Sequence, residues 1–127
     1  MKILGIGVDI IKNQRIRNLI KNKIFIKRTF GKNEIKFSNK ISNNVSYFAK
    51  RFAAKEAFAK SLGTGFRNSL NFKDIEILND KIGKPYYLRS KKIHNIINNK
   101  YKIKKFNLFL SISDEKYYSV AFTILQK

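Results

Sequence analysis

The chain has 127 residues, 43% of them apolar, and its 28 Lys and Arg against 8 Asp and Glu give a formal net charge of +20. This length predicts one domain, residues 1–127, and the apolar content favours a folded core over disorder. The lack of cysteine excludes disulfides and thiolate metal sites. Because the sequence also lacks a long apolar run and a secretory leader pattern, we expect a cytoplasmic protein with no membrane partner.

The positive charge has two possible sources. Such a charge attracts polyanions, which include nucleic acids, phosphorylated cofactors and acidic proteins. Lys, Asn, Ile and Phe are frequent even in loop-like stretches such as NNKYKIKKFN, which is the pattern that an A+T-rich coding sequence leaves. Charge alone therefore does not identify the partner.

The first predicted element is a strand over residues 2–10, KILGIGVDI. Its alternation places apolar side chains on one face, namely Leu4, Ile6, Val8 and Ile10. The other face carries Gly5, Gly7 and Asp9. Glycine within a strand marks a close approach by backbone or by a ligand. We therefore expect either that Asp9 faces a ligand in the space above the glycines, or that the glycines make a tight packing contact while Asp9 caps the next helix.

The rest of the chain alternates between helical and strand-like patterns. Apolar residues recur with helical spacing in four segments, residues 12–22, 32–38, 46–62 and 90–100. The longest has a stop signal in Gly63 and a candidate N-cap in Asn43, Asn44 or Ser46. Residues 75–89 read as two strands around a turn. Residues 105–113 and 117–125 alternate well and are predicted to pair as a hairpin. The mixture predicts a single α+β domain.

The stretch RFAAKEAFAKSLGTG, residues 51–65, holds the clearest candidates for chemistry. Residues four apart share a helix face, so Glu56 and Lys60 continue the line of Phe48 and Phe52, and we expect Glu56 to be partly buried. One explanation is a Glu56–Lys60 pair within the helix, worth only about 0.2–0.5 kcal/mol when exposed. The other is that Glu56 and Asp9 share a divalent cation.

A cation held by these two carboxylates is predicted to be Mg²⁺, because it favours hard oxygen ligands and completes its shell with waters and phosphates. Lys60 and Arg51 would then meet the remaining phosphate charge, and the GTGFR segment offers backbone N–H groups to an anion. The sequence lacks the third glycine of a dinucleotide-binding turn and any GxxxxGK[ST] motif, so neither standard nucleotide fold is indicated.

Four motifs resemble, in order and spacing, those of the holo-[acyl-carrier-protein] synthases, the short trimeric branch of the 4′-phosphopantetheinyl transferases: GIGVDI, RFAAKEAFAKSLGTG, GKPY and SISDEKYYSVAFTI. The resemblance covers essentially the whole chain. It implies an α+β fold in which an antiparallel sheet packs against a long central helix. It also implies Mg²⁺-dependent transfer of 4′-phosphopantetheine from coenzyme A to a serine of apo acyl carrier protein. The products are the holo carrier protein, which supports fatty acid biosynthesis, and adenosine 3′,5′-bisphosphate.

The same resemblance assigns roles to individual residues. It implies that Asp9 and Glu56 bind Mg²⁺ and that Glu56 and Lys60 act in catalysis. The implied contacts to coenzyme A are Arg51, Lys60, Gly63, Thr64, Gly65, Gly83, Lys84 and Pro85. Arg15 and Arg28 fall where the family meets its acidic carrier protein. The serine proton is predicted to leave to Glu56 or to a metal-bound water, and the sequence does not choose between them.

The resemblance further implies a homotrimer with sites between subunits. The Phe and Tyr residues within 106–126 fit either burial at such an interface or an ordinary sheet core. Many family members have His where this chain has Asp114, and a carboxylate cannot serve as a cationic phosphate contact. We expect that role to be absent or to be filled by a neighbouring Lys or Arg.

Two other functions compete with this prediction. The charge and the interleaved aromatics are also typical of a small RNA-binding protein. However, the sequence lacks the RNP1 motif of RNA-recognition domains, and RNA binding would not explain the positions of Asp9 and Glu56. We therefore expect no nucleic-acid partner. The second alternative is a chain that binds carrier protein without transferring anything, against which Asp9, Glu56 and Lys60 argue.

Overall fold

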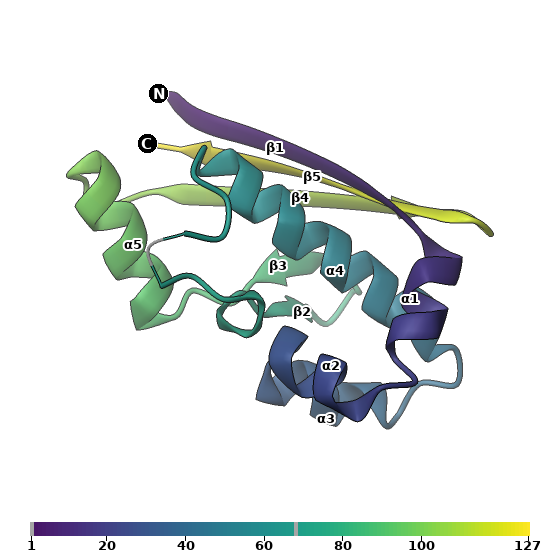
Figure 1. Ribbon diagram of the computed structural model, residues 1–127. Coiled ribbons are helices and arrows are strands. Elements are labelled where there is room, and N and C mark those ends of the chain that lie inside the picture. The colour runs from purple at the N-terminus through teal and green to yellow at the C-terminus, as the bar shows by residue number, and fades with distance from the viewer. Residues whose placement is uncertain (1, 68) are drawn as a thin grey trace.

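A computed structural model describes residues 2–67 and 69–127, and its centre is a helix lying across one face of a three-stranded antiparallel sheet (Figure 1). The strands are β1 (Ile3–Lys12), β5 (Tyr118–Gln126) and β4 (Asn107–Asp114), in that spatial order. The helix is α4 (Asn44–Ser61). These elements confirm the first strand, the long helix and the terminal hairpin. They also confirm the α+β class with an antiparallel sheet against a long central helix.

Helix α4 is buried on most of its sides, because the sheet covers one side and segments from both before and after it in the sequence cover the other (Figure 1). Its sequence interleaves small alanines with phenylalanines, so neighbouring backbone can approach it closely. Of the three candidate caps, Asn43 is the one used, since its side-chain oxygen accepts a hydrogen bond of 3.4 Å from the Ser46 N–H. Gly63 follows the last turn with a φ of +77°, which favours glycine and ends the helix.

Two glycines of β1 lie directly under the backbone of α4. A Cβ atom added at Gly5 would come within 1.8 Å of the Ser61 carbonyl oxygen. One added at Gly7 would come within 1.9 Å of the Ala57 carbonyl oxygen. The tight packing contact is therefore confirmed. The alternative was a ligand in the space above these glycines, but the backbone of α4 fills that space.

The segment after β1 forms two short helices where one was predicted. These are α1 (Asn13–Leu19) and α2 (Lys23–Thr29), and the second was not predicted. The side chain of Asn22 accepts a backbone hydrogen bond of 2.8 Å and so starts α2. Helix α1 starts from Lys12 with no side-chain cap, so the prediction that Asp9 caps it is wrong.

The remaining predicted elements are confirmed. They are α3 (Lys32–Ser38), β2 (Ile77–Asn79), β3 (Pro85–Tyr87) and α5 (Lys91–Tyr101). A short 3₁₀ helix, η1 (Phe72–Asp74), precedes β2 and was not predicted. Strands β2 and β3 form a separate two-stranded sheet, on the side of α4 that faces away from β1 (Figure 1). None of the described helices is both long enough and apolar enough to cross a bilayer.

The face of the large sheet that is turned away from α4 is apolar and exposed. Antiparallel pairing places Val8 opposite Phe122 on this face. The exposed fractions are 59% for Ile6, 53% for Val8, 62% for Ile10, 49% for Phe109 and 40% for Phe122, and we call these five residues the outer sheet face. A core position is thus wrong for most of the terminal aromatics. It holds for Phe106 and fails for Phe109, Tyr117, Tyr118 and Phe122.

Candidate active site

Strand β1 and helix α4 bring three predicted site residues together, and we call Asp9, Glu56 and Lys60 the acid cluster. Lys60 Nζ lies 3.2 Å from Asp9 Oδ1 and donates a second hydrogen bond of 3.0 Å to the Val8 carbonyl oxygen. Glu56 lies one helical turn before Lys60. Within the described residues, Lys60 pairs with the acid of the strand and not with Glu56, so the intrahelical Glu56–Lys60 pair is wrong.

The two carboxylates of the acid cluster lie in a partly buried setting. Burial raises the pKa of Asp9, and the hydrogen bond from Lys60 opposes that rise. Burial also raises the pKa of Glu56, and the nearby negative charge of Asp9 raises it further. Glu56 makes no hydrogen bond to any residue that the structure describes. The prediction that Glu56 is partly buried is confirmed.

Arg15 lies closer to the acid cluster than its predicted role suggests. Its charge lowers the pKa of both Asp9 and Glu56. Its guanidinium lies 5.9 Å from the centre of the Phe52 ring, one turn before Glu56 on α4. The end of the acid cluster nearest to α1 is therefore positively charged, as a site for a phosphate or an acidic protein requires.

The donor set of the acid cluster fits Mg²⁺. Two carboxylates that repel each other, one of them without a hydrogen-bond donor, are stabilised by a hard divalent cation. Among residues 2–67 and 69–127, no group of three or more His, Cys, Asp or Glu residues is close enough to hold a metal ion. A cation at Asp9 and Glu56 would therefore need substrate phosphate and water to complete its shell, which is the usual arrangement for Mg²⁺.

A second group of predicted residues lines a cavity of about 160 Å³ beside β4, which we call the β4-edge cavity. Its walls are formed by Lys50, Arg51, Asn79, Gly83, Pro85, Ile112 and Asp114. Arg51 is only 5% exposed, and its guanidinium stacks 3.7 Å from the centre of the Tyr47 ring and donates to the Asn79 side chain. Its buried Nε has no partner within the described residues. The structure thus brings together three of the predicted coenzyme A contacts, Arg51, Gly83 and Pro85. Lys84, between the last two in the sequence, is exposed.

The other predicted residues lie elsewhere. Thr64, between Gly63 and Gly65, lines a different cavity of about 350 Å³ at the far end of α4, beside α5. Lys100 of α5 donates to the Leu62 carbonyl oxygen there and so holds the end of the helix. Arg28 is exposed in the last turn of α2. One chain therefore does not gather all the predicted coenzyme A contacts into one pocket.

The acid cluster and the β4-edge cavity lie at opposite edges of the large sheet. The order of strands is β1, β5, β4, so β5 separates the strand of Asp9 from the strand of Asp114. Neighbouring strands lie about 4.8 Å apart. A substrate that touched both groups in one chain would have to cross the sheet or α4, and the two groups therefore present themselves to different sides of the molecule.

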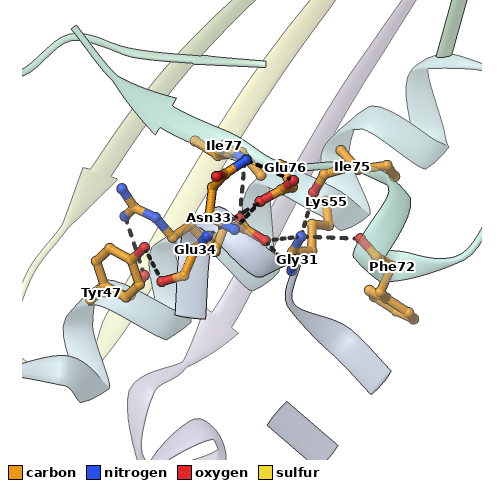
Figure 2. Close-up of polar contacts among 10 residues, drawn as sticks. Gly31, Asn33, Glu34, Tyr47, Lys55, Phe72, Ile75, Glu76 and Ile77 are labelled. Atoms are coloured by element: carbon orange, nitrogen blue, oxygen red, sulfur yellow. Dashed lines mark hydrogen bonds and ion pairs between the residues drawn. The ribbon is translucent and has the colours of Figure 1, made fainter. Parts of the chain in front are cut away.

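Sequence reasoning missed a buried ion pair elsewhere on α4. Lys55 Nζ lies 2.6 Å from Glu34 Oε1, and both side chains are fully buried. The ammonium also donates to the carbonyl oxygens of Phe72, at 3.0 Å, and Ile75 (Figure 2). Burial lowers the pKa of Lys55, and the Glu34 carboxylate opposes that effect.

The carboxylate of Glu34 is held just as fully. It accepts hydrogen bonds from the N–H groups of Gly31, at 2.9 Å, and Ile77, at 3.0 Å (Figure 2). This Lys55–Glu34 network therefore ties α3, α4 and the start of β2 together. Glu34 follows Gly31 by three residues, the spacing of a capping box, and this was the available sequence signal.

The comparisons with known proteins identify the family of this chain. Residues 5–120 match the family model of the 4′-phosphopantetheinyl transferase superfamily. The chain is 60% identical, over 127 residues, to the holo-[acyl-carrier-protein] synthase of Pelagibacter ubique, with 100% of this chain and 99% of the relative covered. It is 45% identical to that of Ruthia magnifica, with 98% and 97% covered.

Solved structures show the same likeness. The holo-[acyl-carrier-protein] synthase from Neisseria meningitidis superposes with a TM-score of 0.89 at 37% identity, covering 98% of this chain and 99% of that one. The enzyme from Bacillus anthracis, solved in complex with CoA (3′,5′-ADP), superposes with a TM-score of 0.81 at 34% identity, with 99% and 98% covered.

Proposed function

Because this chain belongs to the 4′-phosphopantetheinyl transferase superfamily, we propose how its residues carry out the reaction of a holo-[acyl-carrier-protein] synthase. The enzyme transfers 4′-phosphopantetheine from coenzyme A to a serine of apo acyl carrier protein. The serine oxygen bonds to the phosphorus next to pantetheine, and the bond from that phosphorus to adenosine 3′,5′-bisphosphate breaks. The observation that supports the mechanism is the pair of partly buried acids, Asp9 and Glu56, beside Lys60.

The acid cluster supplies the groups that this transfer needs. Mg²⁺ held by Asp9 and Glu56 would neutralise charge on the transferring phosphoryl group. Lys60 uses two of its three N–H donors on Asp9 and Val8, and its exposed ammonium is available to the negative charge that develops on the leaving bisphosphate. We assign the serine proton to Glu56, whose carboxylate accepts no hydrogen bond from the described residues.

The working form is proposed to be a homotrimer with its sites between subunits. A monomer rarely exposes a contiguous apolar patch of the size of the outer sheet face to water. Cyclic packing through this face would place the β1 edge of one subunit beside the β4 edge of the next. The acid cluster of one subunit and the β4-edge cavity of its neighbour would then hold the two ends of one coenzyme A molecule.

The carrier protein is proposed to dock on the basic surface formed by α1 and α2. Arg15 lies beside the acid cluster, so an acidic protein bound to it would present its serine there. Arg28, exposed at the end of α2, would contact the same partner farther from the chemistry. We propose a cytoplasmic location, where coenzyme A and the carrier protein are both present.

The direct test of the transfer is the intact mass of an apo acyl carrier protein after incubation with this protein, coenzyme A and Mg²⁺. We expect the mass to rise by one phosphopantetheine group and expect EDTA to prevent the rise. No gain with several carrier proteins and a folded enzyme would contradict the function. A gain that EDTA leaves unchanged would contradict only the metal.

Mixed trimers test the placement of sites between subunits. Asp9→Ala removes the acid cluster, and Arg51→Ala alters the β4-edge cavity. If neighbours share a site, mixing the two inactive variants and letting their subunits exchange restores part of the activity, because some interfaces then combine an intact acid cluster with an intact cavity. No recovery, with exchange verified by native mass spectrometry, would contradict shared sites.

A further inference from the structure

The β4-edge cavity contains one carboxylate among its cations. Lys50 and Arg51 line it on the α4 side, and Asp114 lines it at the end of β4. Asp114 is also the position at which many members of the family that the sequence resembles have His. A carboxylate here places negative charge where a phosphate of the substrate is expected to bind. The effect of this charge on phosphate binding therefore has to be explained.

The structure fixes the Asp114 carboxylate at the start of α4. Asp114 Oδ2 accepts a hydrogen bond of 2.9 Å from the Ser46 hydroxyl, in the first turn of the helix. The N-terminus of a helix carries partial positive charge and attracts anions. The carboxylate of Asp114 therefore occupies a position that would otherwise favour a phosphate, and it lines the same cavity as Lys50 and Arg51.

The chemistry of coenzyme A identifies the phosphate that is affected. Its adenosine end carries the 5′-diphosphate and a separate 3′-monophosphate. The 5′-diphosphate must reach the acid cluster, because its outer phosphorus is the one that is transferred. The inner 5′-phosphate remains on the adenosine after transfer, but it lies next to the transferred phosphorus, at the acid cluster. The phosphate expected with the adenosine in the β4-edge cavity is therefore the 3′-monophosphate.

We propose that Asp114 weakens recognition of the 3′-phosphate and so sets the preference of this enzyme between coenzyme A and 3′-dephospho-coenzyme A. The inference rests on the proposed function, specifically on adenosine binding in the β4-edge cavity. Lys50 and Arg51 still attract the 3′-phosphate, and Asp114 offsets that attraction. Coenzyme A and its dephospho form should consequently be used with similar KM values.

The test compares Asp114→Asn with Glu115→Gln in transfer assays with both donors. The asparagine keeps an oxygen for the Ser46 hydroxyl and removes only the charge. The control removes an equal charge one residue farther along, and glutamine keeps the oxygen that accepts from the N–H groups of Tyr117 and Tyr118. Glu115 does not line the β4-edge cavity.

We expect Asp114→Asn to lower KM for coenzyme A by roughly fivefold, the upper range for a partly exposed charge pair. KM for 3′-dephospho-coenzyme A should stay within about twofold, and Glu115→Gln should change neither KM by more than that. The fivefold difference should shrink in high salt, because exposed charges are screened over a Debye length of about 8 Å at physiological ionic strength.

The outcomes separate this inference from the function on which it rests. An equal change for both donors, or no change for either, would overturn the role of Asp114 while transfer itself stands. No transfer from either donor by any of the proteins would overturn the proposed function and the inference together. Equilibrium binding of adenosine 3′,5′-bisphosphate and adenosine 5′-monophosphate gives a second readout, in which only the bisphosphate should bind Asp114→Asn more tightly than wild type.

Discussion

Two of the three lysines of helix α4, Lys55 and Lys60, each pair with an acid from another element. Lys55 meets Glu34 in the core, where both side chains are fully buried and each accepts or donates several further hydrogen bonds. Lys60 meets Asp9 near the surface, with 53% of the Lys60 side chain exposed, and Glu56 beside them has no hydrogen-bond partner among the described residues. The first pair is complete in itself, whereas the second leaves Glu56 without a hydrogen-bond donor and so leaves groups available to a ligand.

This difference shows how the same residue types serve stability in one place and chemistry in another. A buried pair with every donor and acceptor satisfied is costly to break, although it adds little over a well-packed apolar core. A half-exposed pair adds little stability, but its unsatisfied groups can bind substrate. We therefore expect changes at the Lys55–Glu34 network to act on folding and changes at the acid cluster to act on activity.

The largest effect is expected from Asp9→Ala. Loss of a charge-stabilising group in an active site costs about 10²–10³ in rate, so kcat/KM for transfer should fall by at least ~100-fold. The melting temperature should change little, because the Asp9–Lys60 pair is partly exposed. Steady-state kinetics and a thermal melt check both statements.

A matched control for Asp9→Ala is Asp74→Ala. Both carboxylates are 16% exposed, and each pairs with one lysine, Asp74 with Lys92 at 2.6 Å. Asp74 lies in η1, apart from both groups of site residues. If Asp74→Ala reduced activity as much as Asp9→Ala does, the special role of the acid cluster would be refuted.

Lys55→Met should be the most damaging change for the fold. It leaves the Glu34 carboxylate buried without its cation, and breaking a buried pair in this way costs about 3–5 kcal/mol of unfolding free energy. Denaturant unfolding at fixed protein concentration measures the loss. The double variant Lys55→Met with Glu34→Gln should recover part of it, and a double variant as unstable as the sum of the single ones would contradict the coupling.

Gly7→Ala should destabilise by a smaller amount and lower activity as well. The added methyl would lie 1.9 Å from the Ala57 carbonyl oxygen, so β1 and α4 must move apart. Overpacking of this kind costs about 1–3 kcal/mol. The movement also separates Asp9 from Glu56, and kcat should fall at temperatures where the protein is still folded. Unchanged kcat in a folded variant would show that the spacing of β1 and α4 does not matter for the site.

Glu56→Gln should slightly raise the stability of the metal-free protein. Burial and Asp9 raise the pKa of Glu56 in the folded state, so the unfolded chain ionises first as pH rises. The carboxyl therefore costs stability from about pH 4.5 upward, and glutamine removes that cost. The gain, below about 1 kcal/mol because the site is partly exposed, should be visible in EDTA at pH 7 and vanish toward pH 4.5.

The fold was largely predictable because its patterns are local. The glycines of β1, the Ala and Phe spacing of α4 and the alternation of the terminal strands each indicate their element directly. Helix α2 was missed because its start depends on the Asn22 cap in an otherwise featureless basic segment. The sequence left open whether Phe109 and Phe122 lie in the core, because a pattern of alternation does not say which face of the sheet the helix covers.

The candidate site was predictable only in part. Asp9, Glu56 and Lys60 come together as expected, because the glycines of β1 allow the backbone of α4 to pack closely against this strand. The partner of Lys60 was wrong, since helical spacing cannot reveal a cross-element ion pair. Lys55 was missed for the same reason, because its acid lies 21 residues away in the sequence.

The most direct test of the acid cluster is Mg²⁺ binding measured by isothermal titration calorimetry in the presence of coenzyme A and without carrier protein. The wild-type chain should bind one Mg²⁺ per acid cluster, and Asp9→Asn should bind it at least ~10-fold more weakly, while Asp74→Asn binds it normally. Equal affinity in wild type and Asp9→Asn would contradict the assignment of Asp9 and Glu56 as the metal site.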